Sequence, residues 1–114
     1  MITIIRGTDN SIKLNFTENG EPFDITGYEV LFTVKAECKI GKDDNEALIT
    51  KNITVHSDPE EGESTLNLSS DDTDVQAGNY YWDLRLIKDG VITQTKRDTI
   101  EVIEGITNRK EETE

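Results

Sequence analysis

The sequence predicts an immunoglobulin-like antiparallel β-sandwich of roughly seven or eight short strands. Apolar side chains alternate with polar ones in segment after segment, a period that is typical of strands with one buried face. Turn-forming dipeptides such as Asn19-Gly20 and Asp89-Gly90 separate the segments, at intervals of roughly 8–12 residues. Only the stretch from Ser69 to Val75 has the composition of a turn of helix. Such a pattern favours two stacked antiparallel sheets over a parallel sheet.

The N-terminal half supplies three predicted strands. The β-branched run Met1 to Arg6 is expected to form an edge strand, and Ser11 to Phe16 alternates cleanly. Phe23 and Ile25 follow in a compact connection and are expected to close one end of the core. The next strand, Tyr28 to Lys35, has apolar residues on both faces, which indicates an interior strand. The inward side chains expected from these strands are Ile12, Leu14, Phe16, Tyr28, Val30, Phe32 and Val34.

The middle of the chain is more polar. A loop is expected from Glu37 to Glu46, then a strand from Ala47 to Val55, and then a Pro- and Gly-containing turn from His56 to Gly62. Ser64 to Leu68 is expected to be a short strand that buries its two leucines. In the helical turn that follows, Ser69 or Ser70 is suited to cap the N-terminus, and acids suit the first turn.

The clearest element is a hairpin from Gly78 to Val102. Asp89-Gly90 accepts positive φ at both centres of a type I′ turn, so the Val-, Ile- and Thr-rich run after it is predicted to return antiparallel. A tyrosine just after Gly78 can donate its hydroxyl to a carbonyl in the preceding turn, and both Tyr80 and Tyr81 qualify by spacing. The inward face of the first strand is predicted to carry Tyr80, Trp82, Leu84 and Leu86.

Length and composition predict one domain with a thin core. We expect residues 1–103 of the 114 to form the sandwich and residues 104–114 to form a charged tail or connector. Only 33% of the residues are hydrophobic, which is low for a globular protein. Either the core is the thin one of a two-sheet sandwich, or a partner completes part of the surface.

The charge pattern excludes some partners. Twenty-four acids against 12 lysines and arginines give a net charge of -12, which opposes binding to nucleic acid or to an anionic membrane. The segment Ile2 to Ile5 lacks the basic start of a signal peptide, and no apolar run approaches the roughly 20 residues that cross a bilayer. We therefore expect a protein made in the cytoplasm, with no membrane partner.

The candidates for catalysis are isolated. Cys38 is the only cysteine and has no histidine near it in sequence, and His56 is the only histidine and sits in a turn. Asp83 lies between two apolar residues, but Arg85 beside it suggests a charge pair on a sheet face. The sequence therefore predicts no catalytic residue, and without a Gly-rich phosphate loop it predicts no cofactor or cofactor-binding residue.

Two acidic clusters are candidates for calcium binding. Asp43 to Glu46 and Asp71 to Asp74 offer hard oxygen ligands, but neither has the alternating ligands, central glycine and closing glutamate of an EF-hand loop. The second cluster is better explained as a helix cap, and one cysteine and one histidine far apart do not make a zinc site. The sequence predicts no metal-binding residue.

Several short segments of the sequence, in their order and spacing, resemble those of a known family. They are MITIIRG with IKLNF, FDITGYEVLFTVK, ALITK, GESTLNLSSDDT and AGNYYWDLRL. Together they are similar to small structural proteins of tailed bacteriophages, in particular to the N-terminal domain of the baseplate upper proteins of siphophages of Gram-positive hosts. The likeness runs from about residue 1 to residue 103. Those proteins continue into long fibrous regions whereas this sequence ends at Glu114, so we expect a tail, connector or accessory protein.

The resemblance implies a non-enzymatic structural or interaction module of a phage or prophage tail or baseplate. Its expected location is the virion, and its expected partners are other tail or baseplate proteins or further copies of itself. The family carries over no catalytic residue. The alternative is a carbohydrate-binding sandwich that contacts host cell-wall glycans, which would need at least two exposed coplanar aromatic side chains. Because alternation places Trp82 on the same face as Leu84 and Leu86, we expect it in the core instead.

Overall fold

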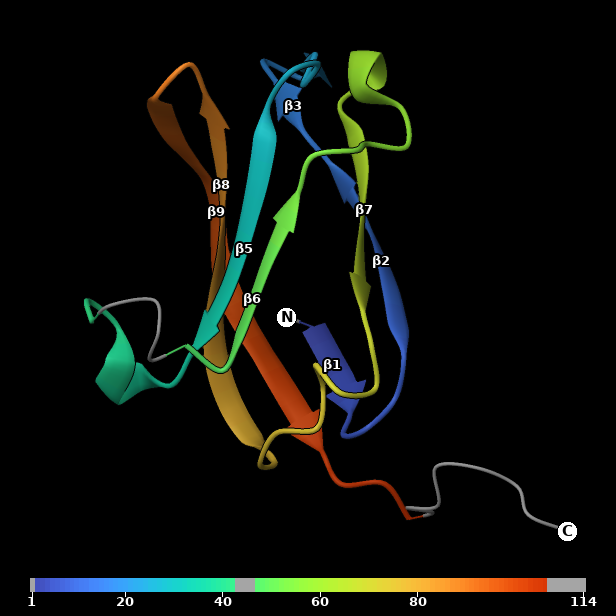
Figure 1. Ribbon diagram of the computed structural model, residues 1–114, viewed down its shortest axis with the longest axis vertical. Helices are drawn as coiled ribbons and strands as arrows, with labels where there is room; N and C mark the ends of the chain where they lie inside the picture. The colour runs from blue at the N-terminus through green and yellow to red at the C-terminus, as the bar shows by residue number, and fades with distance from the viewer. Residues whose placement is uncertain (1, 43–46, 107–114) are drawn as a thin grey trace, which may run out of the picture.

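Two β-layers of unequal width face each other in the computed structural model, which describes residues 2–42 and 47–106, and of residues 94 and 95 the backbone alone (Figure 1). One layer is a five-stranded sheet in the order β1-β9-β8-β5-β6, and the other is the pair β2-β7. A ribbon of two short strands, β3-β4, extends beyond β2. The strands are β1 (Ile2–Ile5), β2 (Asn10–Asn15), β3 (Thr17–Glu18), β4 (Glu21–Pro22), β5 (Glu29–Lys35), β6 (Ile49–Ile53), β7 (Glu63–Leu68), β8 (Gly78–Lys88) and β9 (Val91–Ile103).

The predicted β-sandwich is confirmed. Seven of the strands in the described residues have four or more residues, and the helical content is limited to the short 3₁₀ turns η1 (Glu37–Lys39) and η3 (Pro59–Glu61). No helix in this part of the chain is both long and apolar enough to cross a membrane. The immunoglobulin-like type of the sandwich stays a prediction. β9 ends at Ile103, and the proposed boundary between a sandwich and a tail stays a prediction too.

One pairing departs from the antiparallel pattern. β1 is the predicted edge strand, but it runs parallel to β9, with Ile2 opposite Ile100 and Ile5 opposite Ile103. Nearly the whole chain separates these two strands, so no tight turn forces them to run in opposite directions. The other strand pairs, including β8-β9, β5-β8 and β2-β7, are antiparallel.

The core lies between the two layers and matches the alternation in the sequence. β5 is an interior strand, as predicted, because β8 and β6 flank it. Trp82 is 5% exposed and packs against Phe32, with 5.7 Å between ring centroids. Ile25 is fully buried, while Phe23, Tyr28, Ile12 and Tyr80 are partly buried at the margins. The buried apolar side chains are Ile4, Leu14, Phe16, Ile25, Val30, Phe32, Val34, Ile49, Leu66, Leu68, Trp82, Leu84, Leu86, Ile100 and Val102.

The local signals for turns are confirmed. Asp89 and Gly90 have φ of 53° and 80°, and Asn19 and Gly20 have 54° and 81°, as type I′ turns require. The Tyr80 hydroxyl donates a hydrogen bond to the carbonyl oxygen of Gln76, so of the two tyrosines Tyr80 makes the corner. This bond ties the start of β8 to the turn before it.

The predicted helical turn after β7 is a single capped turn. The Ser69 Oγ accepts a hydrogen bond from the backbone N–H of Asp72 at 3.2 Å, and the Asp72 carboxylate accepts one from the N–H of Ser69 at 2.8 Å. Ser69 rather than Ser70 is therefore the cap, in the reciprocal arrangement of a capping box. The buried Thr73 completes the turn, because its hydroxyl donates to the carbonyl of Thr8 at 2.7 Å.

His56, which the sequence places in a turn, is partly buried and hydrogen-bonded through both ring nitrogens. Its Nε2 lies 2.7 Å from the carbonyl oxygen of Tyr28, and its Nδ1 lies 2.9 Å from the Oγ of Ser64. A carbonyl can only accept, so Nε2 carries the proton, and in the neutral ring Nδ1 accepts from the Ser64 hydroxyl. The imidazole therefore joins β7, in the narrow layer, to the residue before β5, in the wide one.

Removing this bridge should destabilise the domain. In His56→Ala the fully buried Ser64 hydroxyl and the Tyr28 carbonyl both lose a partner, and we expect the free energy of unfolding to fall by about 1–3 kcal/mol. The control is Val55→Ala, because Val55 is 85% exposed and its truncation should change stability by about 0.5 kcal/mol or less. Equal denaturation midpoints for the two variants would contradict a bridging role.

Gly62 permits a close crossing of three backbone segments. It has a φ of 72°, its carbonyl accepts from the N–H of Phe16 at 2.8 Å, and the carbonyl of Phe16 accepts from the N–H of Phe23 at 2.9 Å. A Cβ on Gly62 would overlap the carbonyl oxygen of Phe16 and lie 2.6 Å from that of Phe23. Only glycine fits here, for reasons of space as well as of backbone conformation.

A matched pair of variants separates those two reasons. Gly20 has a φ of 81° but has open space where a Cβ would go, so Gly20→Ala should cost about 1 kcal/mol for conformation alone. Gly62→Ala should cost a further 1–3 kcal/mol or more, because the backbone must move to relieve the overlap. Thermal and chemical unfolding measure both losses, and equal losses would show that the crossing relaxes freely.

Candidate binding groove

The residues considered for catalysis lie on separate elements. Cys38 is exposed in η1, His56 bridges the two layers, and Asp83 is on the outer face of β8. The carboxylate of Asp83 faces the guanidinium of Arg85 at 3.5 Å, so the predicted charge pair is present, along one strand. The structure does not bring these three side chains together, and the predicted absence of a catalytic centre stays a prediction.

The second acidic cluster is engaged with cations of the protein itself. The Asp72 carboxylate lies 2.7 Å from the Nζ of Lys51, and the Asp74 carboxylate lies 3.0 Å from the Nε of Arg6. In the residues that the structure describes, no group of three or more His, Cys, Asp or Glu side chains is placed to hold a metal ion. The first cluster, Asp43 to Glu46, lies outside the described residues.

Arg6 joins the end of β9 to the end of β1 and to the capped turn. Its guanidinium contacts Glu104 at 2.9 Å as well as Asp74, and its backbone N–H donates to the carbonyl of Ile103 at 2.8 Å. The hydrogen bonds that Arg6 donates to Glu104 and Asp74 raise the pKa of Arg6 above its usual value. One side chain thus ties together β1, the capped turn and the end of β9.

Asp72 links stability to pH. Partial burial by itself would raise the pKa of this carboxyl, but hydrogen bonds from Lys51 and Ser69 outweigh burial and lower the pKa below its ordinary value of 3.8. A carboxyl whose pKa is lower in the folded than in the unfolded state contributes stability above the unfolded pKa, and the contribution is lost as pH falls through the folded value.

We therefore expect the domain to lose stability as the pH falls below about 4, and part of the loss to depend on Asp72. Asp72→Asn should lower the free energy of unfolding at pH 7 by about 1 kcal/mol and reduce the dependence on pH below 4. Denaturation at a series of pH values measures this slope. The matched control is Glu21→Gln in the exposed β3-β4 ribbon, and a slope unchanged by Asp72→Asn would contradict the linkage.

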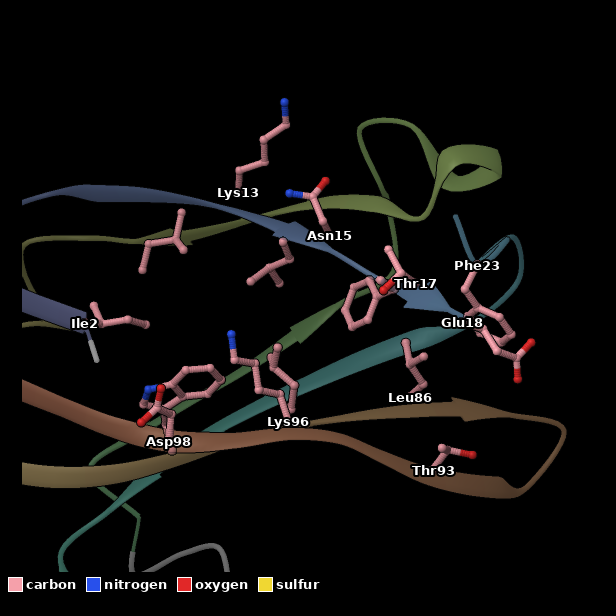
Figure 2. A pocket seen from close by; sticks show the side chains of 15 residues that line it. Ile2, Lys13, Asn15, Thr17, Glu18, Phe23, Leu86, Thr93, Lys96 and Asp98 are labelled. Atoms are coloured by element: carbon pink, nitrogen blue, oxygen red, sulfur yellow. The ribbon is translucent and has the colours of Figure 1, made fainter. Parts of the chain in front are cut away.

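A groove lies between the two layers on the side of β2 and β9. Its volume is about 720 Å³, and its apolar floor is formed by Trp82, Leu84 and Leu86 of β8. Figure 2 shows Lys96 and Asp98 rising from β9 into the space between the layers, while Lys13 and Asn15 on β2 point away from it. The groove exists because a layer of two strands covers a sheet of five.

Both long sides of the groove are strand edges without a neighbouring strand in the described chain. β2 pairs with β7 on one side only. β9 pairs with β1 over Ile100 to Ile103, but from Val91 to Thr99 it pairs with β8 alone. In the part of the chain that the structure describes, β1 therefore borders β9 at one end of the sheet, and the rest of β9 has β8 as its only neighbouring strand.

The β9 wall of the groove is polar. The Nζ of Lys96 lies 5.9 Å from the centre of the Trp82 ring, and the indole N–H of Trp82 donates to the carbonyl of Thr99 at 3.0 Å. The Asp98 carboxylate accepts from the N–H of Thr99 at 2.8 Å, and this bond, helped by the charge of Lys96, lowers the pKa of Asp98. Polar groups thus line the β9 wall above the apolar floor.

Alternation along the sequence does not predict this groove. A register shift between Leu84 and Arg85 changes which residues of β9 face inward, so that Lys96 is opposite Leu84 although the simple alternation from Val91 would not place it there. A possible signal was the polar character of alternate positions before Ile100, namely Asp98 and Lys96. Only the pairing of strands shows that these positions lie at an open edge.

Comparison with known proteins identifies the family. The model of the BppU N-terminal domain, the N-terminal domain of baseplate upper proteins, matches residues 1–110. The chain belongs to this family. The resemblance to a phage baseplate domain is therefore confirmed, and it covers nearly all of the sequence. This BppU N-terminal domain is thus related to a structural component of phage baseplates.

Two solved structures are similar to this chain at low sequence identity. A putative glycoside hydrolase from Bacteroides vulgatus is similar with a TM-score of 0.53 and 10% identity, over 92% of this chain but only 17% of that protein. The NK cell receptor Nkp44 is similar with a TM-score of 0.49 and 14% identity, over 91% of this chain and 95% of the receptor. No curated protein sequence matches the chain. At such identities the first structure indicates a shared fold only.

Proposed function

We propose that this BppU N-terminal domain is a non-enzymatic docking module of a phage baseplate or tail, which binds other baseplate proteins in the virion. The observation that carries the proposal is the family match over residues 1–110. The separate positions of Cys38, His56 and Asp83 agree with a protein that performs no reaction. The open groove agrees with a sandwich whose surface is completed in an assembly.

The glycan-binding alternative loses its main support. Trp82 is 5% exposed, and its indole N–H is used by Thr99, so it offers no stacking surface to a sugar. Phe23 and Tyr28 are half-buried and meet edge to face, with 62° between their planes, so they do not form a coplanar platform. The likeness to a glycoside hydrolase covers 17% of that protein at 10% identity and brings no hydrolase chemistry with it.

Docking to a different protein is favoured over self-association. With a net charge of -12, two copies repel each other at long range unless they bring specific contacts together. A baseplate partner with a basic or neutral surface would not experience this long-range repulsion. The predicted homo-oligomer is therefore the less favoured arrangement.

The proposal is tested by co-expressing the domain with each protein encoded beside it among the phage tail genes. We expect it to co-elute with at least one of them at a fixed stoichiometry in size-exclusion chromatography with light scattering. We also expect mass spectrometry of purified virions to detect it at a constant copy number. A domain that remains a monomer with every neighbour, and that is missing from purified virions, would contradict the proposed function.

A further inference from the structure

The outer face of the wide sheet, which is turned away from β2 and β7, carries apolar side chains. An antiparallel sheet that is covered on one side usually has polar side chains on the other. Phe32 of β5 and Trp82 of β8 point into the core, so by alternation their neighbours point outward. These neighbours are Leu31 and Tyr81, and both are half-buried. The layer β2-β7 lies on the opposite side, so within the described chain no second sheet packs on them.

A depression of about 450 Å³ lies on this face, and we call it the outer depression. Leu31 and Tyr81 line it, together with the residues that follow η1. Figure 1 shows η1 beyond the end of β5, on the side away from β2 and β7. Ile40, just after η1, is 40% exposed at the margin. The outer depression thus offers apolar surface that is still accessible to a partner.

Positive charge gathers around the outer depression. Four of the 12 lysines and arginines of the chain line it, but only one of the 24 acids is found among the described residues that do so. In a protein with a net charge of -12, this makes the outer depression the complement of an acidic group. The cations are Lys35, Lys42, Arg85 and Arg97, and the acid is Asp83.

The two arginines are not neutralised by this one acid. The Asp83 carboxylate lies 3.5 Å from the Nε of Arg85, and the Arg85 side chain is still 50% exposed. Asp83 is also opposite Arg97 in the β8-β9 pairing, but no carboxylate of the described residues lies within ion-pair distance of the exposed Arg97. Lys35 serves the fold instead, because its Nζ donates to the carbonyl of Lys42 at 2.8 Å.

The residue types around the outer depression are those that bind protein surfaces. Tyrosine and arginine carry a large share of the binding energy in protein interfaces. An arginine can also donate two parallel hydrogen bonds to one carboxylate. A matching partner would therefore place a carboxylate against Arg85 and Arg97 and an apolar side chain against Leu31 and Tyr81.

A second copy of the chain matches this surface poorly. A twofold contact through the outer depression would bring Arg85 and Arg97 of both copies together, and like charges at an interface repel. The net charge of -12 adds repulsion at long range. The charges favour a different protein, in which one or two acids lie on an otherwise neutral or basic surface.

Building on the docking function proposed above, we propose that the outer depression is the docking surface and that its occupant is an acidic segment of a different baseplate protein. A carboxylate of that segment pairs with Arg85 and Arg97, and an apolar side chain next to it covers Leu31 and Tyr81. The carboxylate supplies specificity and speeds association, and the apolar contact supplies most of the affinity.

The first probe is a pair of capped peptides, Glu-Leu-Phe-Glu-Gly and Gln-Leu-Phe-Gln-Gly, which differ in charge alone. NMR of the isotopically labelled domain follows their binding. We expect the Glu peptide to shift the amide signals of Tyr81, Arg85 and Arg97, to bind about fivefold or more tightly than the Gln peptide, and to weaken as salt is added. Equal binding of the two peptides, no binding at millimolar concentration, or shifts confined to other strands would overturn the proposal.

Two pairs of variants test the charge and the apolar contact with purified tail proteins as the second probe. Arg97→Gln removes a charge from the outer depression, and its control Lys13→Gln removes one from β2, where the lysine is 64% exposed. Ile40→Ser removes apolar surface at the margin, and its control Val55→Ser does so at a side chain that is 85% exposed elsewhere. Thermal unfolding of each variant establishes that the sandwich is intact.

We expect Arg97→Gln and Ile40→Ser each to weaken association with the tail protein that binds the unaltered domain by about fivefold or more, and the controls by about twofold or less. Light scattering should find the domain alone to be a monomer, and a dimer that Arg97→Gln dissociates would assign the surface to a second copy instead. If Arg97→Gln lowers thermal stability, and neutralising Asp43, Asp44 and Glu46 lowers it equally, the arginines serve the acidic segment of the chain itself. Either result would overturn the proposal.

The same variants separate this proposal from the docking function on which it rests. If the unaltered domain associates with a tail protein, and Arg97→Gln and Ile40→Ser associate equally well, docking stands and the outer depression is not its site. If the unaltered domain associates with none of them, the docking function itself fails. Weaker association of Arg97→Gln and Ile40→Ser, with both controls unchanged, supports both.

Discussion

The unequal width of the two layers is the constraint on which the rest of the molecule depends. A sheet of five strands has an apolar inner face, and a pair of strands, β2 and β7, must cover it. The pair covers β5 and β8 well, so that Val30, Phe32 and Leu86 are almost completely buried. It does not reach across the free part of β9, and there the inner face becomes polar instead. The inner face of the five-stranded sheet is thus apolar where the strand pair covers it and polar beside the free part of β9.

A narrow second layer needs specific ties to the first, because a pair of strands buries little surface of its own. The His56 imidazole joins Ser64 of β7 to the carbonyl of Tyr28, and Gly62 lets Phe16 and Phe23 approach the backbone closely at the same end. At the opposite end Arg6 gathers Asp74, Glu104 and the carbonyl of Ile103. The contacts of His56 and Arg6 are hydrogen bonds and ion pairs, and the contact at Gly62 is a close crossing of backbone segments. Such contacts explain how a chain with 33% hydrophobic residues holds two layers together.

For a member of a baseplate family, the surfaces that bear most on function are exposed strand edges rather than catalytic pockets. An unpaired strand edge is a hazard for an isolated protein, because it can pair with any other exposed edge. Here the edge of β9 carries Lys96 and Asp98 on its inner face, and Trp82 already satisfies the carbonyl of Thr99. Charged side chains on the inner face of an edge strand are one of the devices that oppose indiscriminate pairing.

The sequence by itself determined most of the strands, the type I′ turns at Asn19-Gly20 and Asp89-Gly90, and most of the core, because alternation and turn chemistry act over a few neighbouring residues. It also carried enough of the family pattern to indicate a baseplate domain. Only the tertiary structure decided that β1 runs parallel to β9, that His56 bridges the layers, and that Tyr80 makes the corner. It alone revealed the groove, because the groove arises from which strands lack a neighbour and from a register shift in β9. Those features depend on contacts between residues far apart in the chain, and no local pattern of side chains specifies them.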